Sequence, residues 1–142
     1  MSIQNNLKLA LSFIDGVNAH DMSNWAQQLA DDFTAEYPGA PSLNKETARM
    51  FNDAFLVAVP DLHFDVIRTL ANGDCVVVHW SATGTQSGPL AMMSGQIIPP
   101  TNRKATVRGV LITEIKDGKI ATERTYWDQI SLLTQLGLMP AA

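Results

Sequence analysis

The sequence predicts an α+β fold in which helices cover one face of a curved antiparallel sheet. Two observations lead to this class. Apolar residues recur at helical spacing as far as Pro60, whereas from Leu62 onward they alternate with polar residues, as in strands. Helices gathered early and a meander of strands late are typical of α+β domains. The 142 residues suit one domain, 1–142, and contain no internal repeat.

The first half of the chain is predicted to hold two helices and a short strand before a loop. An amphipathic helix runs from Ile3 to Val17, and a second, shorter helix is expected around Trp25, Leu29 and Phe33. The stretch 33–37 is interpreted as a short strand. It ends at the Pro/Gly cluster 38–41, which is typical of a loop.

A further helix follows this loop. Asn44 is a favourable N-cap, Glu46 suits the positive end of the helix dipole, and Pro60 ends the segment. Its apolar face is formed by Met50, Phe51, Ala54, Phe55 and Ala58. Such a stripe is more often core than a binding site, but it also forms one wall of a cavity where a sheet curves over it.

The first predicted hairpin turns at Asn72-Gly73-Asp74, between a strand from Leu62 and a partner strand over 75–86. A two-residue loop puts Leu62, Phe64, Val66 and Leu70 on one face with Cys75, Val77, His79, Ser81 and Thr83. The opposite face then carries Val76, Val78 and Trp80. Residues 84–104 form a long irregular connection, typical of a lid, a rim or an interface arm.

The second predicted hairpin joins 104–115 to 119–128 and pairs Ile115 with Ile120. Without a bulge, Gly109 faces Tyr126 and Val107 faces Asp128, whereas a bulge would shift this register by one residue. In the first register, Gly109 leaves open space beside the Tyr126 ring, as sheets do to admit a ligand.

Composition excludes several classes of function. The net charge of −4, without any Lys/Arg run, argues against a nucleic-acid or membrane surface. No stretch is apolar enough for a signal peptide or a membrane span, so a cytoplasmic location is expected. Cys75 is the single cysteine, and His20, His63 and His79 lack the spacing of metal ligands, so no metal site is predicted.

Short strings along the whole chain resemble the SnoaL-like polyketide cyclase family of the nuclear-transport-factor-2-like (ketosteroid-isomerase-like) superfamily. They are PDL at 60–62, GD at 73–74, TGT at 83–85, PPT at 99–101, DGKI at 117–120, Asp128 and LLTQLG at 132–137. The resemblance implies a cone-shaped curved sheet wrapped around N-terminal helices, with a pocket between them. It also implies a homodimer through the convex sheet face and no cofactor.

The resemblance carries the acid/base Asp of the last strand in the family's aldol-type cyclases onto Asp128. Gln86 stands where members commonly have His, and Thr122 and Arg124 replace the usual Glu and Trp. These departures concern the substrate more than the fold. Asp128 has a second reading, since Asp is a favoured N-cap and a helix begins directly after it.

Candidate site residues follow from the predicted faces. Asp128 and His79 are the catalytic candidates. The substrate-binding candidates are Tyr126, Arg124, Gln86, Phe51, Phe55 and Gly109. A carboxylate in apolar surroundings can remove a proton next to a carbonyl group, and nearby donors can stabilise the enolate. An Arg beside Asp128 would lower the pKa of that carboxylate and weaken it as a base.

Three functions are therefore considered. The first is a cofactor-independent cyclase or isomerase acting on a small apolar, polyketide-like carbonyl compound. The second is a non-catalytic protein of the same fold that binds a small hydrophobic ligand. An epoxide hydrolase ranks third, because it needs a second carboxylate and no further inward Asp or Glu stands out in the strand pattern.

Overall fold

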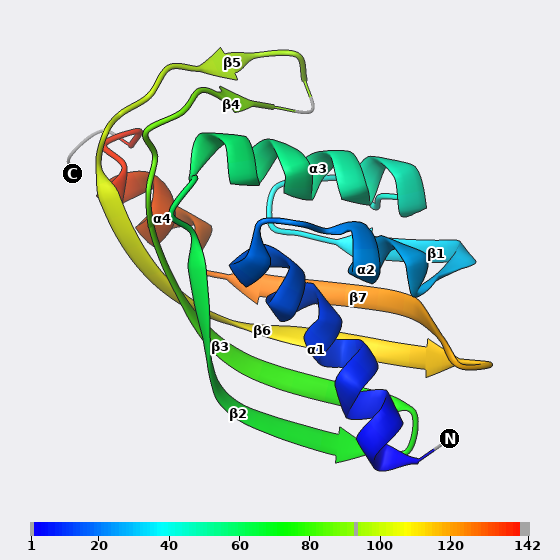
Figure 1. Cartoon of the computed structure of the whole chain (residues 1–142). Coiled ribbons are helices and arrows are strands. Elements are labelled where there is room, and N and C mark those ends of the chain that lie inside the picture. The colour runs from blue at the N-terminus through cyan, green and yellow to red at the C-terminus, as the bar shows by residue number, and fades with distance from the viewer. Residues whose placement is uncertain (1, 93, 140–142) are drawn as a thin grey trace.

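A computed structural model describes residues 2–92 and 94–139, and it confirms the predicted α+β class and its curved sheet (Figure 1). The sheet has five strands in the order β1-β7-β6-β3-β2, all antiparallel except β1 beside β7, and it is not closed into a barrel. The helices are α1 (Ile3–Ala19), α2 (Ser23–Gln27), α3 (Lys45–Ala58) and α4 (Gln129–Gln135). The sheet strands are β1 (Leu29–Glu36), β2 (His63–Asn72), β3 (Cys75–Thr85), β6 (Lys104–Lys116) and β7 (Lys119–Trp127). A small hairpin of β4 (Leu90–Ala91) and β5 (Ile97–Ile98) lies beyond α3.

The helix ends follow local sequence. The Asn44 side chain accepts a hydrogen bond from the backbone of Thr47, whose hydroxyl caps Asn44 in return, so the predicted N-cap is confirmed. The expected helix around Trp25 is shorter than predicted, because α2 ends at Gln27. Leu29 and Phe33 instead lie on the buried side of β1, whose backbone pairs with β7.

The core lies between the inner face of the sheet and helices α1, α2 and α3 (Figure 1). Trp25 of α2 is completely buried and makes edge-to-face contacts with Phe13 of α1 and Phe33 of β1. The sheet contributes mainly alternate residues of β3 and β6, which are Val76, Val78, Trp80, Ala82, Leu111 and Ile115. None of the described helices is both long and apolar enough to cross a membrane.

An irregularity near the β6–β7 turn decides which residues of β7 face the helices. Ile115 pairs with Ile120 as predicted, but Glu114 pairs with Thr122, so Ala121 is an extra residue on β7. Beyond this bulge, Gly109 pairs with Trp127, and the predicted pairing of Gly109 with Tyr126 is wrong by one residue.

The shift reverses the faces of the strand, because successive side chains point to opposite sides of a sheet. Glu123, Thr125 and Trp127 face the helices, and Arg124 and Tyr126 face away from them.

A second irregularity lies on β2 between Val66 and Arg68. Val66 pairs with Trp80, whereas Arg68 pairs with His79, so Ile67 is the extra residue. The prediction that Phe64 and Val66 share a face with His79 is therefore wrong, because both lie before the bulge, on the helix-covered side with Trp80.

The space beside Gly109 is occupied. A Cβ placed there would lie 2.5 Å from Cζ2 of Trp80 and would also collide with the carbonyl oxygen of Tyr126. The predicted open space for a ligand is therefore wrong, since the missing side chain makes room for the Trp80 indole.

We expect Gly109→Ala to lower the free energy of unfolding by about 1–3 kcal/mol, because the added methyl group overpacks the core. Chemical denaturation measures this change. Ser81→Ala, on the outer face of β3, is the control and should change it by less than about 0.5 kcal/mol. Equal stability of the two variants would contradict the packing described here.

Candidate active site

Glu123 of β7 lies buried between the sheet and α2. Its side chain is completely inaccessible to solvent, and it is the one charged residue of the buried class among the described residues. Trp25 Nε1 donates to Oε1 at 2.7 Å, and Thr113 Oγ1 donates to Oε2 at 3.0 Å. Three separate elements, α2, β6 and β7, therefore hold this carboxyl group in place.

Burial raises the pKa of Glu123 from its ordinary value of 4.5 to about 7, although the hydrogen bonds from Trp25 and Thr113 act in the opposite direction. A group with this pKa is present in both protonation states near neutral pH. It can therefore accept and return a proton, which a surface glutamate does poorly.

Tyr37 and Asn52 form a second buried polar pair. Asn52 Nδ2 donates to the hydroxyl oxygen of Tyr37 at 2.9 Å. Burial raises the pKa of Tyr37, and the negative charge of Glu123 raises it further. The hydroxyl group thus keeps its proton and, since its oxygen is the acceptor for Asn52, the O–H remains able to donate.

Aromatic rings form the wall of this region on the side of α3. Phe51 stacks on Tyr37 with ring centres 4.5 Å apart, and Phe55 lies 6.5 Å from Trp127. Trp127 also lies 6.4 Å from Trp80. Phe51 and Phe55 are half-buried residues of α3. Their role as substrate contacts remains a prediction.

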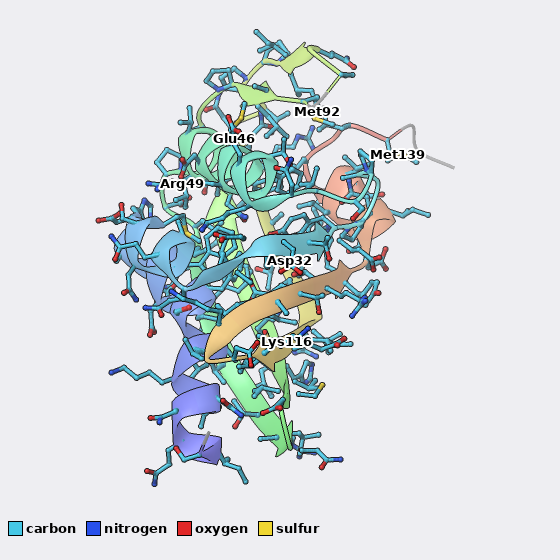
Figure 2. All side chains as sticks on the ribbon, turned by 90° about the vertical axis from the view of Figure 1, so that its right-hand side faces the viewer. Asp32, Glu46, Arg49, Met92, Lys116 and Met139 are labelled. Atoms are coloured by element: carbon cyan, nitrogen blue, oxygen red, sulfur yellow. The ribbon has the colours of Figure 1, made fainter. Side chains whose placement is uncertain are left out.

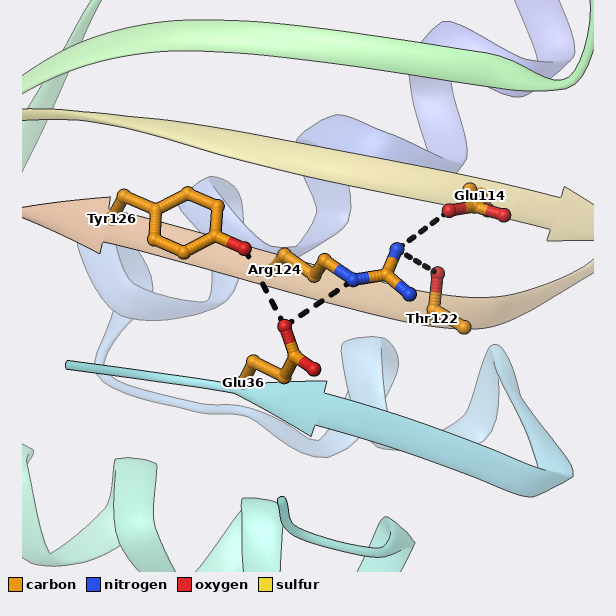
Figure 3. A network of polar contacts seen from close by, with 5 residues as sticks. All are labelled: Glu36, Glu114, Thr122, Arg124 and Tyr126. Carbon is orange, nitrogen blue, oxygen red and sulfur yellow. Dashed lines mark hydrogen bonds and ion pairs between the residues drawn. The ribbon is translucent and has the colours of Figure 1, made fainter. Parts of the chain in front are cut away.

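Arg124 and Tyr126 lie on the outer face of the sheet, because of the bulge at Ala121 (Figure 3). Arg124 forms ion pairs with Glu36 of β1 at 3.3 Å and with Glu114 of β6 at 2.6 Å. The Tyr126 hydroxyl donates to Glu36 at 3.4 Å. The expectation that Arg124 and Tyr126 point into the predicted pocket between the sheet and the helices is wrong.

Asp128 follows β7 at the surface and is the N-cap of α4. Its Oδ1 accepts a hydrogen bond from the backbone N–H of Ser131 at 2.9 Å, and the residue is exposed. This is the geometry of the helix-cap reading. The acid/base role of Asp128 stays a prediction, and its exposure to solvent does not favour that role.

His79 is half-buried on the outer face, between Arg68 of β2 and Val110 of β6. It is therefore separated by the sheet from Glu123 and from the aromatic wall. The sheet places His79 and Asp128 in different regions from the buried carboxyl group, and their catalytic roles remain predictions.

Gln86 closes the base of the irregular segment that carries the β4–β5 hairpin. Its Nε2 donates to the carbonyl oxygens of Gly88 and Pro99 at 3.2 and 3.1 Å. Its Oε1 accepts from the Thr101 hydroxyl at 2.9 Å. The amide is thus engaged by its own loop, and a substrate contact by Gln86 stays a prediction that this geometry does not favour.

Two surface hollows stand out in the described part of the chain, and both lie outside the region of Glu123. The first is lined by charged residues that include Asp32 and Lys116 (Figure 2). The second lies beside α1 and α2 and includes Ser12 and Asn24. Within residues 2–92 and 94–139, no three His, Cys, Asp or Glu side chains gather in an arrangement that could hold a metal ion.

Glu123 is not among the site residues that the sequence pattern predicts. The available signal was the spacing to Trp127, since the large apolar indole belongs on the buried side and Glu123 lies four residues before it on the same face. That signal conflicts with the inward and outward alternation of side chains counted along β7 from the hairpin turn. The counted alternation is correct only up to the bulge at Ala121.

The sequence matches the family model of SnoaL-like polyketide cyclases over residues 8–136. The chain belongs to this family. No curated protein matches the sequence.

Solved structures show the same fold at low sequence identity. A candidate SnoaL-like polyketide cyclase from Jannaschia sp. CCS1 has a TM-score of 0.82 and 22% identity over 99% of this chain and 98% of its own. AclR from Streptomyces galilaeus, a candidate hydroxylase, has a TM-score of 0.81 and 22% identity over 99% and 90%. An epoxide hydrolase from M. tuberculosis, described as LEH-like, has a TM-score of 0.70 and 16% identity over 94% and 90%.

Stability should depend on pH through Glu123. Because its pKa is about 7 in the folded protein and 4.5 ordinarily, folded chains bind more protons than unfolded ones between these values. The contribution of Glu123 is therefore most favourable below pH 4.5. It falls by about 1.4 kcal/mol per pH unit up to pH 7 and then levels off.

Denaturation of the wild type and of Glu123→Gln between pH 4.5 and 8 measures this contribution as the difference between the two proteins. Gln can accept from Trp25 and donate to the Thr113 oxygen, so the variant keeps both contacts without the charge. A difference that does not change with pH would contradict the raised pKa.

Proposed function

We propose that this protein is a cofactor-independent cyclase or isomerase that transfers a proton on a small, mostly apolar carbonyl compound, with Glu123 as general acid and base. The observation that carries the proposal is a completely buried carboxyl group with a pKa of about 7. Membership of the SnoaL-like polyketide cyclase family supports the same class of chemistry.

The reaction begins when the ionised form of Glu123 removes a proton from the carbon next to a carbonyl group, which leaves an enolate. In a cyclase, the enolate carbon forms a bond with a second carbonyl carbon of the same molecule. The new alkoxide oxygen then takes a proton, and Glu123 has one to return. In an isomerase, Glu123 returns the proton to a different carbon.

Glu123 thus takes the acid/base role that the family resemblance implies for Asp128. A base must reach the substrate in a place where water does not solvate it, and Asp128 is exposed while Glu123 is buried. The substrate would enter from the side of α3, where Phe51 and Phe55 are half-buried and Phe51 stacks on the buried Tyr37.

A ligand-binding protein without catalysis is the second candidate. The observation that favours it is that both oxygens of Glu123 already accept hydrogen bonds, from Trp25 and Thr113, so the acid could be a fixed part of the core. A carboxylate has further lone pairs, however, and two donors leave it able to accept a proton.

The epoxide hydrolase remains the third candidate. The expectation that no inward-facing Asp or Glu occurs in the strands is wrong, because Glu123 faces the helices. Among the described residues, no second buried Asp or Glu joins it, and Arg124 lies on the other face of the sheet. A pair of carboxylates with an Arg to activate water is therefore not assembled around Glu123.

We also propose that the protein forms a homodimer through the outer, convex face of the sheet. Leu70 of β2 is 62% exposed there, and Tyr126 of β7 is 46% exposed. Val77 and Ile112 continue the row of Leu70 across β3 and β6, and Val110 pairs with Tyr126 in the next outward row. These five residues form an apolar strip, and such a strip favours association with a second copy.

Glu123→Gln should lower the rate of proton exchange by at least about 100-fold, because the variant has no proton acceptor in the site. NMR can follow deuterium uptake next to the carbonyl groups of a panel of enolisable aromatic ketones and diketones in D₂O. Asp128→Asn, which keeps a good N-cap, is the matched control and should retain exchange. Loss in Asp128→Asn alone would return the role to Asp128, and a wild type that exchanges protons no faster than the protein-free solution would favour the ligand-binding protein.

Leu70→Asp should convert the dimer to a monomer at micromolar concentration, because a charge would be buried in the apolar strip. Size-exclusion chromatography with light scattering measures the mass. Val57→Asp replaces a residue of α3 that is equally exposed, at 61%, but lies on the helix side, and it should leave the dimer intact. A monomeric wild type would contradict the proposal.

A further inference from the structure

Two polar side chains on the inner face of the sheet have no partner. Among the described residues, neither Trp80 Nε1 nor Thr125 Oγ1 makes a hydrogen bond, although the two residues are only 1% and 2% exposed. Buried donors are nearly always paired, because an unpaired one has lost its hydrogen bond to water. Two such groups on one face of a sheet therefore require an explanation.

Both groups belong to the same part of the inner face. Trp80, Gly109 and Trp127 pair across β3, β6 and β7, and the next inward row is Val78, Leu111 and Thr125. Because Gly109 has no side chain, the Trp80 indole extends over β6, where its Cζ2 would touch any Cβ at Gly109. The centre of this indole also lies 6.4 Å from that of Trp127 on β7, the strand that carries Thr125.

Thr125 also lies beside the buried acid. It is two residues from Glu123 on the same face of β7, a backbone separation of about 6.6 Å. Thr113, the other buried threonine of the inner face, donates to Glu123. The Thr113 hydroxyl is thus engaged by the carboxyl group of Glu123, whereas the Thr125 hydroxyl has no partner among the described residues.

We propose that the Trp80 N–H and the Thr125 O–H bind a carbonyl oxygen of the substrate and stabilise the enolate oxygen that forms from it. This inference rests on the proposed function of Glu123, which removes the proton. A carbonyl oxygen is two bonds from the carbon that loses its proton, so its donors must lie near the base without touching it. The spacing of Glu123 and Thr125 along one face of β7 meets this requirement.

The surrounding side chains indicate the class of substrate. Trp127 packs beside Trp80, and Tyr37 lies between Trp127 and Phe51 of α3, so flat aromatic rings are grouped next to the donors. The structure therefore favours an enolisable ketone attached to a flat aromatic or conjugated group. A bound oxygen would satisfy the two donors that the free protein leaves unpaired.

The test compares 2-naphthol, which resembles an enol of such a ketone, with naphthalene, which lacks the oxygen. Fluorescence titration gives the Kd of each, and their ratio separates the oxygen contact from changes in packing. Thr125→Val, of the same shape, should lower the preference for 2-naphthol about tenfold, the loss expected for one hydrogen bond. Trp80→Phe should lower it similarly, whereas Thr125→Ser, which keeps the hydroxyl, should not.

Thermal stability gives an independent readout. Thr125→Val removes an unpaired buried hydroxyl and should raise the Tm of the ligand-free protein. Thr113→Val is the matched comparison and should lower the Tm, because Glu123 loses a donor. The proposal is overturned if Thr125→Val lowers the Tm as Thr113→Val does, if its preference for 2-naphthol is unchanged, or if the wild type shows no such preference.

The two proposals fail separately. If Glu123→Gln abolishes proton exchange while Thr125→Val keeps its preference for 2-naphthol, only the oxygen site is wrong. If Thr125→Val loses this preference while Glu123→Gln still exchanges protons, the oxygen site binds the probe, but the base is another residue.

Discussion

One extra residue in β7 determines which chemistry the inner face of the sheet can offer. Ala121 has no partner on β6, and from this point each side chain of β7 lies on the face opposite to that expected from the turn. The bulge places Glu123 and Thr125 beneath the helices and Arg124 outside. In an unbulged strand, the guanidinium of Arg124 would be buried instead, and its charge would hold a nearby carboxyl group in the ionised form.

The buried carboxyl group is compatible with the fold because it never lacks partners. Trp25 and Thr113 donate to it from α2 and β6, so the acid also ties the short helix to the sheet. The opposite case is found at Trp80 and Thr125, whose buried side-chain N–H and O–H groups have no partner among residues 2–92 and 94–139. A fold selected for stability alone would have apolar side chains at these two positions. Buried polar groups without partners are typical of sites that bind a ligand.

Much of the architecture could be predicted because it depends on local sequence. The Asn44 cap and the pairing of Ile115 with Ile120 follow from residues close together in the chain. The bulges could not be predicted in this way, since neither Ala121 nor Ile67 is a glycine or any other residue that marks one. A single bulge reverses the alternation of inward and outward side chains along the rest of the strand. For this reason the sequence pattern predicts Arg124 and Tyr126, and not Glu123, on the face toward the helices.

The site divides its tasks between two parts of the fold. The sheet supplies the polar groups, with Glu123 and Thr125 on one strand and Trp80 two strands away, and hydrogen bonding between strands fixes their spacing. Helix α3 supplies Phe51 and Phe55, whose rings are half-buried and belong to one helix. Replacing these rings would alter the shape of the wall without disturbing the strand register. Under the proposed function, α3 can therefore change in sequence to fit another ketone while the sheet keeps the positions of Glu123, Thr125 and Trp80.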